Sequence, residues 1–210
     1  MTKISLSRIH FPVTTLGPGQ RIGLWVQGCS IHCKGCMSPD TWHRRESGID
    51  ITVLMQQLKP WLQEADGITI SGGEPFEQRD ALQCLLTELR QDFQGDILVY
   101  SGYEWDDIHQ DILDMNGLID ALITGPYQES APQTLALRGS DNQQLHCLTS
   151  LGKQRFSQYD TQLIDSHKAL DLAVDETGRI FLLGIPQRHD ISYLQSWLEQ
   201  QEQPLKQLKK

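Results

Sequence analysis

The sequence predicts an α/β fold built on a mostly parallel sheet, and three observations carry this prediction. Short apolar strands alternate with amphipathic helices from about residue 22 to about residue 123, which is typical of β-α-β units. Apolar residues make up 39% of the 210 residues, enough for a packed core, and no low-complexity tract interrupts them. At roughly 100–200 residues per domain, the length fits one full domain with a small extension.

The first strands and helices follow in order. Residues 22–26 form an apolar strand between glycine-rich turns. Asp50 is expected to cap a helix over residues 51–64, whose apolar side chains recur at helical spacing. Pro60 is expected to end or bend that helix late in its course. Residues 68–70 form the next short strand, which runs into a glycine-rich turn.

The same alternation continues along the chain. A helix is expected over residues 78–92, a strand over 97–100, a helix over 104–115 and a strand over 118–123. Residues 126–143 are polar and are expected to form a loop. The pattern therefore supplies several parallel strands whose carboxyl ends meet at one edge of a sheet.

The C-terminal part does not continue the alternation of strands and helices. Residues 170–174 and 180–183 flank the turn sequence Asp-Glu-Thr-Gly and predict a β-hairpin, and a last helix is expected near residues 191–201. We therefore divide the chain into a core domain, residues 1–150, and an extension, residues 151–210, that is expected to pack on the core.

Charge and hydropathy exclude several classes of function. Lys plus Arg number 18 and Asp plus Glu 27, a net charge of −9, so general nucleic-acid binding is not expected. No apolar run approaches the ~18–20 residues that span a bilayer, and the N-terminus lacks the apolar core of a signal peptide. A cytoplasmic protein without a membrane partner is therefore expected. Arg21 is expected to make an ordinary surface ion pair.

Three of the five cysteines form the most informative motif. Cys29, Cys33 and Cys36 have the spacing C-x3-C-x2-C, which can bring three thiolates to one centre. Soft thiolates select zinc, copper(I) or iron–sulfur clusters. A closed zinc site needs a fourth ligand, which His32 or His43 could supply, so iron–sulfur and zinc both remain open at this point.

The remaining cysteines, Cys84 and Cys147, are isolated in the sequence and are expected to be small buried apolar residues.

A glycine-rich turn provides a second motif. Residues 71–75, Ser-Gly-Gly-Glu-Pro, follow one strand and precede a helix. Glycines allow backbone to approach a ligand closely. The cysteine motif also follows a strand, and ligands of parallel α/β folds gather at the carboxyl ends of strands. The two motifs can therefore face one cavity.

Taken together, these stretches resemble the radical S-adenosylmethionine (SAM) enzymes, and most closely the glycyl-radical enzyme activases of anaerobic ribonucleotide reductase. The resemblance runs in order over roughly residues 8–150. It rests on Gly17-Pro18-Gly19-Gln20-Arg21, Gln27 to Cys36, Pro39-Asp40-Thr41-Trp42, Ser71-Gly72-Gly73-Glu74-Pro75, Tyr100-Ser101-Gly102-Tyr103 and Arg138-Gly139-Ser140-Asp141-Asn142-Gln143.

The resemblance implies a set of cofactors and residues that bind them. Three irons of a [4Fe–4S] cluster would be held by the cysteines, and the fourth iron would chelate the amino and carboxylate groups of SAM. The metal ligands implied are Cys29, Cys33 and Cys36, and the residues implied to lie against SAM are Gly35, Cys36, Met37, Ser71, Gly72, Gly73, Glu74, Tyr100 and Ser101.

The resemblance also implies a reaction. The reduced cluster would cleave SAM, and the resulting radical would take a hydrogen atom from a glycine of a partner enzyme, for which anaerobic ribonucleotide reductase is expected. A flavodoxin- or ferredoxin-type protein would donate the electron. No catalytic residue beyond the cluster and SAM is expected, because the cofactors carry the chemistry.

The same resemblance implies a partial, open β/α barrel of the radical SAM type with a small C-terminal hairpin and helix, since a complete barrel typically uses ~250 residues. An open side would admit a glycine-bearing loop of the partner.

Two other hypotheses remain open. The chain could be a radical SAM enzyme acting on a small metabolite, such as a deazapurine-pathway carboxylate synthase. It could also be a metal-binding interaction module without catalytic activity.

Overall fold

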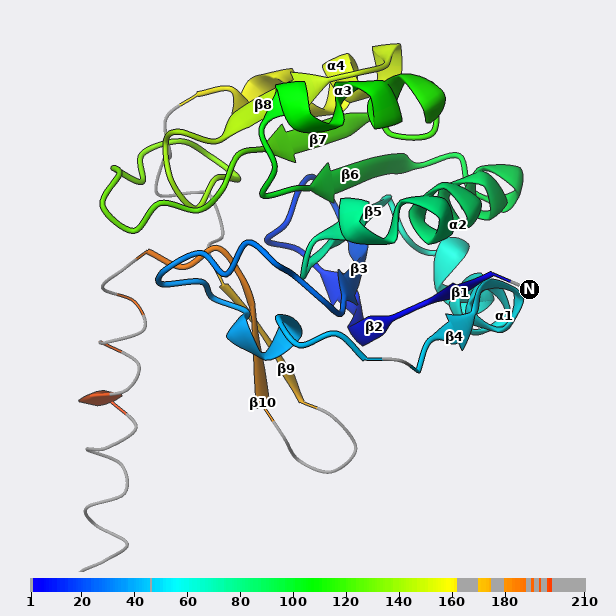
Figure 1. The fold of residues 1–210 in the computed structure, drawn as a ribbon, viewed down its shortest axis with the longest axis horizontal. Helices are drawn as coiled ribbons and strands as arrows, with labels where there is room; N and C mark the ends of the chain where they lie inside the picture. The colour runs from blue at the N-terminus through cyan, green and yellow to red at the C-terminus, as the bar shows by residue number, and fades with distance from the viewer. Residues whose placement is uncertain are drawn as a thin grey trace, which may run out of the picture.

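The computed structural model describes residues 2–45, 47–161, 170–174 and 180–187, together with residues 190, 193, 196 and 197. Its centre is a six-stranded sheet in the order β2-β3-β5-β6-β7-β8 (Figure 1). The four inner strands are mutually parallel, whereas the two edge strands are antiparallel to their neighbours. The predicted α/β class with a mostly parallel sheet is confirmed. The strands of this sheet are β2 (Leu6–Val13), β3 (Arg21–Val26), β5 (Gly67–Gly72), β6 (Asp96–Tyr100), β7 (Ala121–Thr124) and β8 (Gln144–Cys147).

Three helices follow the predicted ranges closely: α1 (Ile51–Leu62), α2 (Arg79–Asp92) and α3 (Trp105–Asp114). The Asp50 carboxylate caps α1 by accepting a hydrogen bond from the Thr52 N–H at 2.9 Å. Pro60 lies inside α1, which continues for two more residues.

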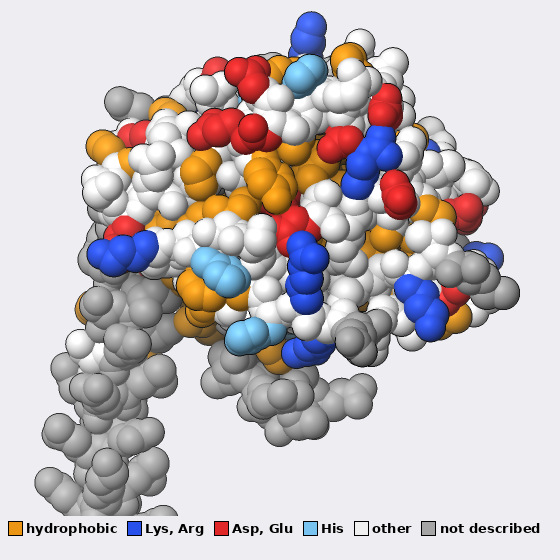
Figure 2. All heavy atoms as spheres, viewed as in Figure 1, with side chains coloured by type: hydrophobic (Ala, Val, Ile, Leu, Met, Phe, Trp, Pro, Cys, Tyr) orange, Lys and Arg blue, Asp and Glu red, His pale blue; other side chains and the backbone are white. Residues whose placement is uncertain are grey.

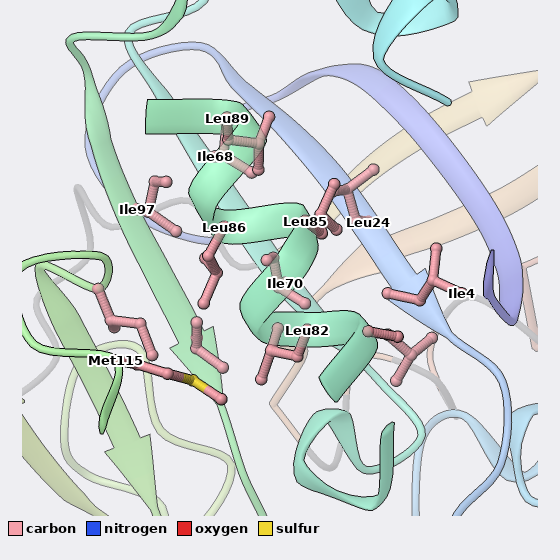
Figure 3. Close-up of a cluster of buried hydrophobic side chains, with 14 of the residues drawn as sticks. Ile4, Leu24, Ile68, Ile70, Leu82, Leu85, Leu86, Leu89, Ile97 and Met115 are labelled. Carbon is pink, nitrogen blue, oxygen red and sulfur yellow. The ribbon is translucent and has the colours of Figure 1, made fainter. Parts of the chain in front are cut away.

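The main hydrophobic core lies between these helices and one face of the sheet. Figure 3 shows the leucines of α2 directed at isoleucines of β5 and β6. Leu82, Leu85, Leu86 and Leu89 recur every three or four residues, so all four reach the core and are fully buried. Burial of each such side chain stabilises the fold by about 1.5–3 kcal/mol.

The opposite face of the sheet is covered by two elements outside the alternating pattern. Helix α4 (Ser150–Phe156) packs Phe156 against Leu98, Ala121 and Ile123. The other element is an antiparallel hairpin of β9 (Leu170–Val174) and β10 (Ile180–Gly184), as predicted.

Short elements complete the described chain. Strands β1 (Lys3–Ile4) and β4 (Ile49–Asp50) pair separately from the main sheet. Three 3₁₀ turns are η1 (Pro39–Thr41), η2 (Pro75–Gln78) and η3 (Ser157–Tyr159). The hairpin turn at 175–178 and most of the helix predicted near 191–201 lie outside the described residues.

Arg21 corrects one expectation. Its side chain is fully buried and pairs with the equally buried carboxylate of Asp96 at 2.6 Å, instead of lying at the surface. The guanidinium also donates to the Thr69 hydroxyl and to the carbonyls of Pro18 and Ile68. A buried cation is tolerated only with such a complete set of partners.

The surface over α3 is acidic. Figure 2 shows Asp and Glu side chains gathered where Figure 1 draws this helix, and Asp106 and Asp107 occupy its first turn. Negative charges in the first turn of a helix interact favourably with the helix dipole. Within the part of the chain that the structure describes, no helix is both long and apolar enough to cross a bilayer.

Candidate cofactor-binding site

The carboxyl ends of the inner strands open onto a cavity of about 470 Å³. A cavity of this size is of the kind that holds one small-molecule ligand. Every residue that the sequence implicates in cluster or SAM binding lines it. These residues are Cys29, Cys33, Gly35, Cys36, Met37, Ser71, Gly72, Gly73, Glu74, Tyr100 and Ser101.

The cysteine loop is closed by backbone hydrogen bonds at its base. The N–H groups of Gly28 and Cys29 donate to the carbonyls of Thr41 and Trp42 at 2.7 and 3.0 Å. Within the loop, the His32 ring stacks on Trp42 with ring centroids 4.7 Å apart. The loop is therefore folded by its own contacts and holds its thiols at the cavity.

The thiols lie half-buried among backbone N–H groups. Burial raises the pKa of Cys29 and of Cys33, while backbone N–H groups favour the thiolates, from His32 and Ile31 at Cys29 and from Tyr127 at Cys33. The Ser38 N–H donates to the sulfur of Cys36 at 3.4 Å. Such N–H donors are found around the sulfurs of iron–sulfur clusters, where they tune the reduction potential.

The chemistry of the three thiols determines which group they can hold. Among the described residues, no three His, Cys, Asp or Glu side chains are grouped so as to hold a metal ion. The three thiols nevertheless line one cavity. Soft thiolates are the ligands that iron–sulfur clusters take, so three thiols lining one cavity fit such a cluster.

The glycine-rich turn is joined directly to the cysteine loop. The Gly73 N–H donates to the Val26 carbonyl at 2.9 Å, and the Glu74 N–H donates to the Gly28 carbonyl at 2.8 Å. A Cβ on residue 73 would lie 2.2 Å from the Gly28 oxygen, and Gly72 has a φ of +103°. Only glycines allow this approach. The two motifs therefore form one continuous edge of the cavity.

Glu74 holds this turn against the end of β6. Its carboxylate is buried and accepts hydrogen bonds from the Phe76 N–H at 3.0 Å, the Ser101 hydroxyl at 2.9 Å and the Gly102 N–H at 2.7 Å. Burial outweighs these donors and raises the pKa of Glu74 to about 7. The side chain thus shapes the cavity by joining two strand ends.

Glu77 makes a second link, between η2 and the cysteine loop. Its carboxylate accepts from the N–H and the hydroxyl of Ser30, both at 2.6 Å, and pairs with Arg44 at 2.7 Å. Partial burial opposes ionisation, but these donors and the Arg44 charge lower the pKa of Glu77 overall. Ser30 directly follows Cys29, so this link holds the loop where its first thiol lies.

The loop of residues 125–143 forms a side of the cavity that the sequence did not predict. The Gln143 amide donates to the Gly125 carbonyl at 3.0 Å and accepts from the Gly139 N–H at 2.8 Å, which folds the loop. Tyr127 and Glu129 line the cavity next to Gly35. The signal for this wall was the motif Arg-Gly-Ser-Asp-Asn-Gln at 138–143, whose role only the structure reveals.

The segment Gly184–Gln187, which leaves the β9–β10 hairpin, forms another unpredicted side of the cavity. Leu16, Trp25, Ile31 and Trp42 add apolar lining. No periodicity in the sequence marks a C-terminal segment as a neighbour of the cysteine loop, because their contact is purely tertiary.

Comparison with known proteins gives a consistent picture. A model of a 4Fe-4S single cluster domain matches residues 15–146. The anaerobic ribonucleoside-triphosphate reductase-activating protein of bacteriophage T4 is 34% identical over 134 residues, which are 61% of this chain and 85% of that protein. The protein of the same name from Escherichia coli K12 is 33% identical over 149 residues, 66% of this chain and 96% of its own length.

Another similarity covers less of both chains. The pyruvate formate-lyase-activating enzyme of Staphylococcus aureus is 36% identical over 97 residues, which are 43% of this chain and 39% of that enzyme.

Proposed function

We propose a function from one premise: the chain belongs to the family of 4Fe-4S single-cluster proteins that includes the activating proteins of anaerobic ribonucleoside-triphosphate reductases. It is a radical SAM activating enzyme that generates a glycyl radical on a partner enzyme. The proposed partner is an anaerobic ribonucleotide reductase.

One observation carries the proposal. The cysteine loop and the glycine-rich turn line one cavity and are hydrogen-bonded to each other at Gly28. A [4Fe–4S] cluster normally takes four thiolates. With three from Cys29, Cys33 and Cys36, one iron would keep a free coordination position in the cavity that Gly72 and Gly73 also line. A ligand with amino and carboxylate groups, as SAM has, suits that position.

The residues of the chain would bind, orient and shield these cofactors. When bound, the cluster and SAM supply one-electron cleavage of the sulfonium and abstraction of a hydrogen atom. Gly72 and Gly73 would let the backbone approach the amino end of SAM, while Gly35 and Met37 would lie beside the cluster. Tyr100 and Ser101 would lie against the adenosine at the end of β6. The apolar side chains of the cavity would exclude water from the radical.

The architecture suits this reaction. We propose that the sheet is the partial, open barrel of radical SAM enzymes, that residues 1–150 are the core domain, and that residues 151–210 are an extension packed on it. A flavodoxin- or ferredoxin-type protein would donate the electron. A cytoplasmic location, where thiols stay reduced, would suit the cluster.

The size of the cavity favours a protein partner over a small metabolite. The cluster and SAM would both have to be accommodated in this cavity of about 470 Å³. A third reactant would then reach the reacting atoms from the rim, as an inserted polypeptide segment can.

Anaerobic reconstitution of the full chain with iron and sulfide tests the proposal. The reduced protein is expected to convert SAM to 5′-deoxyadenosine and methionine, and to produce a glycyl radical signal in electron spin resonance when the reductase of the same source is added. A variant with Cys29, Cys33 and Cys36 all changed to Ser is the control. A fully reconstituted, reduced protein that leaves SAM intact would refute the proposal.

A further inference from the structure

The C-terminal part of the chain lies beyond the region that the family model matches. The alignments take in 85–96% of the activating proteins of phage T4 and Escherichia coli but only 61–66% of this chain. The family model ends at residue 146. The β9–β10 hairpin lies after this point, outside the region that the family model matches.

The hairpin packs on the face of the sheet that lies opposite the main hydrophobic core. Leu183 is buried against Val13, Leu16 and Trp25, and Ala173 and Phe181 pack around them. Figure 1 draws the hairpin beside β2 and β3, the strands and loop that supply these residues.

Polar contacts fix the position of the hairpin along the sheet. The Asp171 carboxylate accepts hydrogen bonds from the Thr14 hydroxyl at 2.9 Å, from the Thr14 N–H and from the Thr15 hydroxyl at 3.2 Å. The Thr15 hydroxyl also contacts the Leu183 carbonyl, at 3.3 Å. Asp171 therefore acts as a positioning residue for the hairpin and for residues 185–187, which follow it directly.

The segment after β10 reaches the cavity. Gly184, Ile185, Pro186 and Gln187 line it. The Gln133 amide donates to the Pro186 carbonyl at 3.1 Å, so the segment is also tied to the loop of residues 125–143.

Gln187 stands out among these residues. Its N–H is held by the Asp190 carboxylate at 2.8 Å, which fixes the backbone. Its side-chain amide has no hydrogen-bond partner among the described residues. An amide offers both donors and an acceptor, the groups that pair with a peptide backbone.

We propose that the segment Gly184–Gln187 forms a recognition wall, which contacts the polypeptide segment that the partner enzyme inserts and thereby determines which partner is accepted. This inference rests on the proposed function. The cysteine loop and the glycine-rich turn lie within residues 15–146, which the family model matches, and would perform the reaction itself. Proteins that perform the same reaction differ in the partner on which they act. The recognition wall lies after residue 146, outside the matched region, and lines the cavity that the partner segment would enter.

Two variants and a control test this role in the full-length, reconstituted protein. Gln187→Ala removes the free amide, and Asp171→Asn weakens the anchor of the hairpin. Leu172→Ala is the matched control, because Leu172 lies on the same hairpin and is 64% exposed, away from the buried cluster. Glycyl radical formation is measured against partner concentration, and each rate is divided by the rate of SAM cleavage without partner.

The recognition wall predicts a change in partner concentration dependence. Gln187→Ala is expected to raise the partner concentration for half-maximal radical formation about tenfold, as truncation of an interface contact does. Asp171→Asn is expected to act in the same direction, and Leu172→Ala to match the wild type.

Two results would separate this inference from the proposed function. If the wild type forms the radical and Gln187→Ala keeps the wild-type concentration dependence, the recognition wall is refuted while the activase function stands. If the wild type cleaves SAM but forms no radical on the partner, both are refuted.

Discussion

The Glu74 carboxylate accepts a hydrogen bond from the Ser101 hydroxyl at 2.9 Å and so joins the turn after β5 to the end of β6. Its second oxygen accepts from the Gly102 N–H at 2.7 Å. These two strand ends form adjacent parts of the cavity. The position of the glycine-rich turn therefore depends on a buried side chain as well as on backbone conformation.

Replacing Glu74 by Gln is expected to destabilise the protein. The amide keeps one acceptor oxygen but turns an NH₂ group toward at least one of the N–H and hydroxyl donors that the carboxylate accepts from. The expected cost is about 1–3 kcal/mol in the free energy of unfolding, measured with urea on the cofactor-free chain. Glu104→Gln is the control, since Glu104 is exposed at the start of α3 and its side chain makes no capping hydrogen bond. Equal stability of the two variants would contradict this role.

The same carboxyl predicts a pH dependence. Burial raises the pKa of Glu74 from 4.5 to about 7, so the folded protein binds this proton more tightly than the unfolded chain does. The Glu74 contribution to the free energy of unfolding is therefore fully present below about pH 4.5 and is lost as the pH rises through about 7. The loss amounts to about 3 kcal/mol. The difference in unfolding free energy between wild type and Glu74→Gln, measured across this range, should show that slope, and a flat difference would contradict it.

Much of the fold follows from local sequence patterns. The leucines of α2 and the cap of α1 at Asp50 are signals that neighbouring residues carry, and the structure confirms both elements. The strand predicted at 118–123 lies instead at Ala121–Thr124, because Asp120 turns its carboxylate to the Ile97 N–H and the Thr149 hydroxyl. A contact between distant residues therefore shifted the start of the strand.

Other elements left no local signal. Strand β2 contains Pro12 and several polar residues and lies at the sheet edge, where strict alternation is not required. Strand β8, at the other edge, has only four residues. The buried position of Arg21 depends on Asp96, which is 75 residues away in the sequence. Pairing at this distance cannot be deduced from periodicity.

The candidate site also combines residues that the sequence predicts with residues that it does not. Its cysteine motif and its glycine motif are each a short run of consecutive residues, and the position of both after strands predicts that they can face one cavity, as the structure shows. Gln187 and Tyr127 come from segments without a comparable pattern, and only the packing of the hairpin and of the polar loop brings them to the cavity.

Cysteine substitutions test the cluster ligands directly. Changing Cys29, Cys33 or Cys36 singly to Ser is expected to remove most of the bound iron after anaerobic reconstitution, because two remaining thiolates cannot hold the cluster firmly. Iron and acid-labile sulfide per chain are the measurements. Cys84→Ser and Cys147→Ser should retain wild-type iron, since neither residue lines the cavity. Loss of iron in either of these two controls would contradict the assignment of the cluster ligands to Cys29, Cys33 and Cys36.

Glu77 is expected to keep the cysteine loop in place. Glu77→Ala leaves the Ser30 N–H and hydroxyl without their acceptor, and charge-assisted hydrogen bonds of this kind contribute about 1.5–3 kcal/mol each. The reconstituted variant should lose iron to a chelator about tenfold faster under anaerobic conditions. Glu64→Ala, an exposed position after α1, is the control. If Glu77→Ala and the control lose iron at the same rate, the link has no role in holding the cluster.

Breaking the buried pair of Arg21 and Asp96 is expected to destabilise the protein strongly. Both side chains are fully buried, so Arg21→Gln would leave the Asp96 charge with only Arg155, which reaches it at 2.9 Å from a partly exposed position. Removing one partner of a buried pair costs about 3–5 kcal/mol. Arg155→Gln should cost about 1 kcal/mol or less, because solvent screens its charge and Arg21 still neutralises Asp96. Urea unfolding of both variants gives the comparison, and similar losses in the two would mean that the buried pair contributes no more than the exposed one.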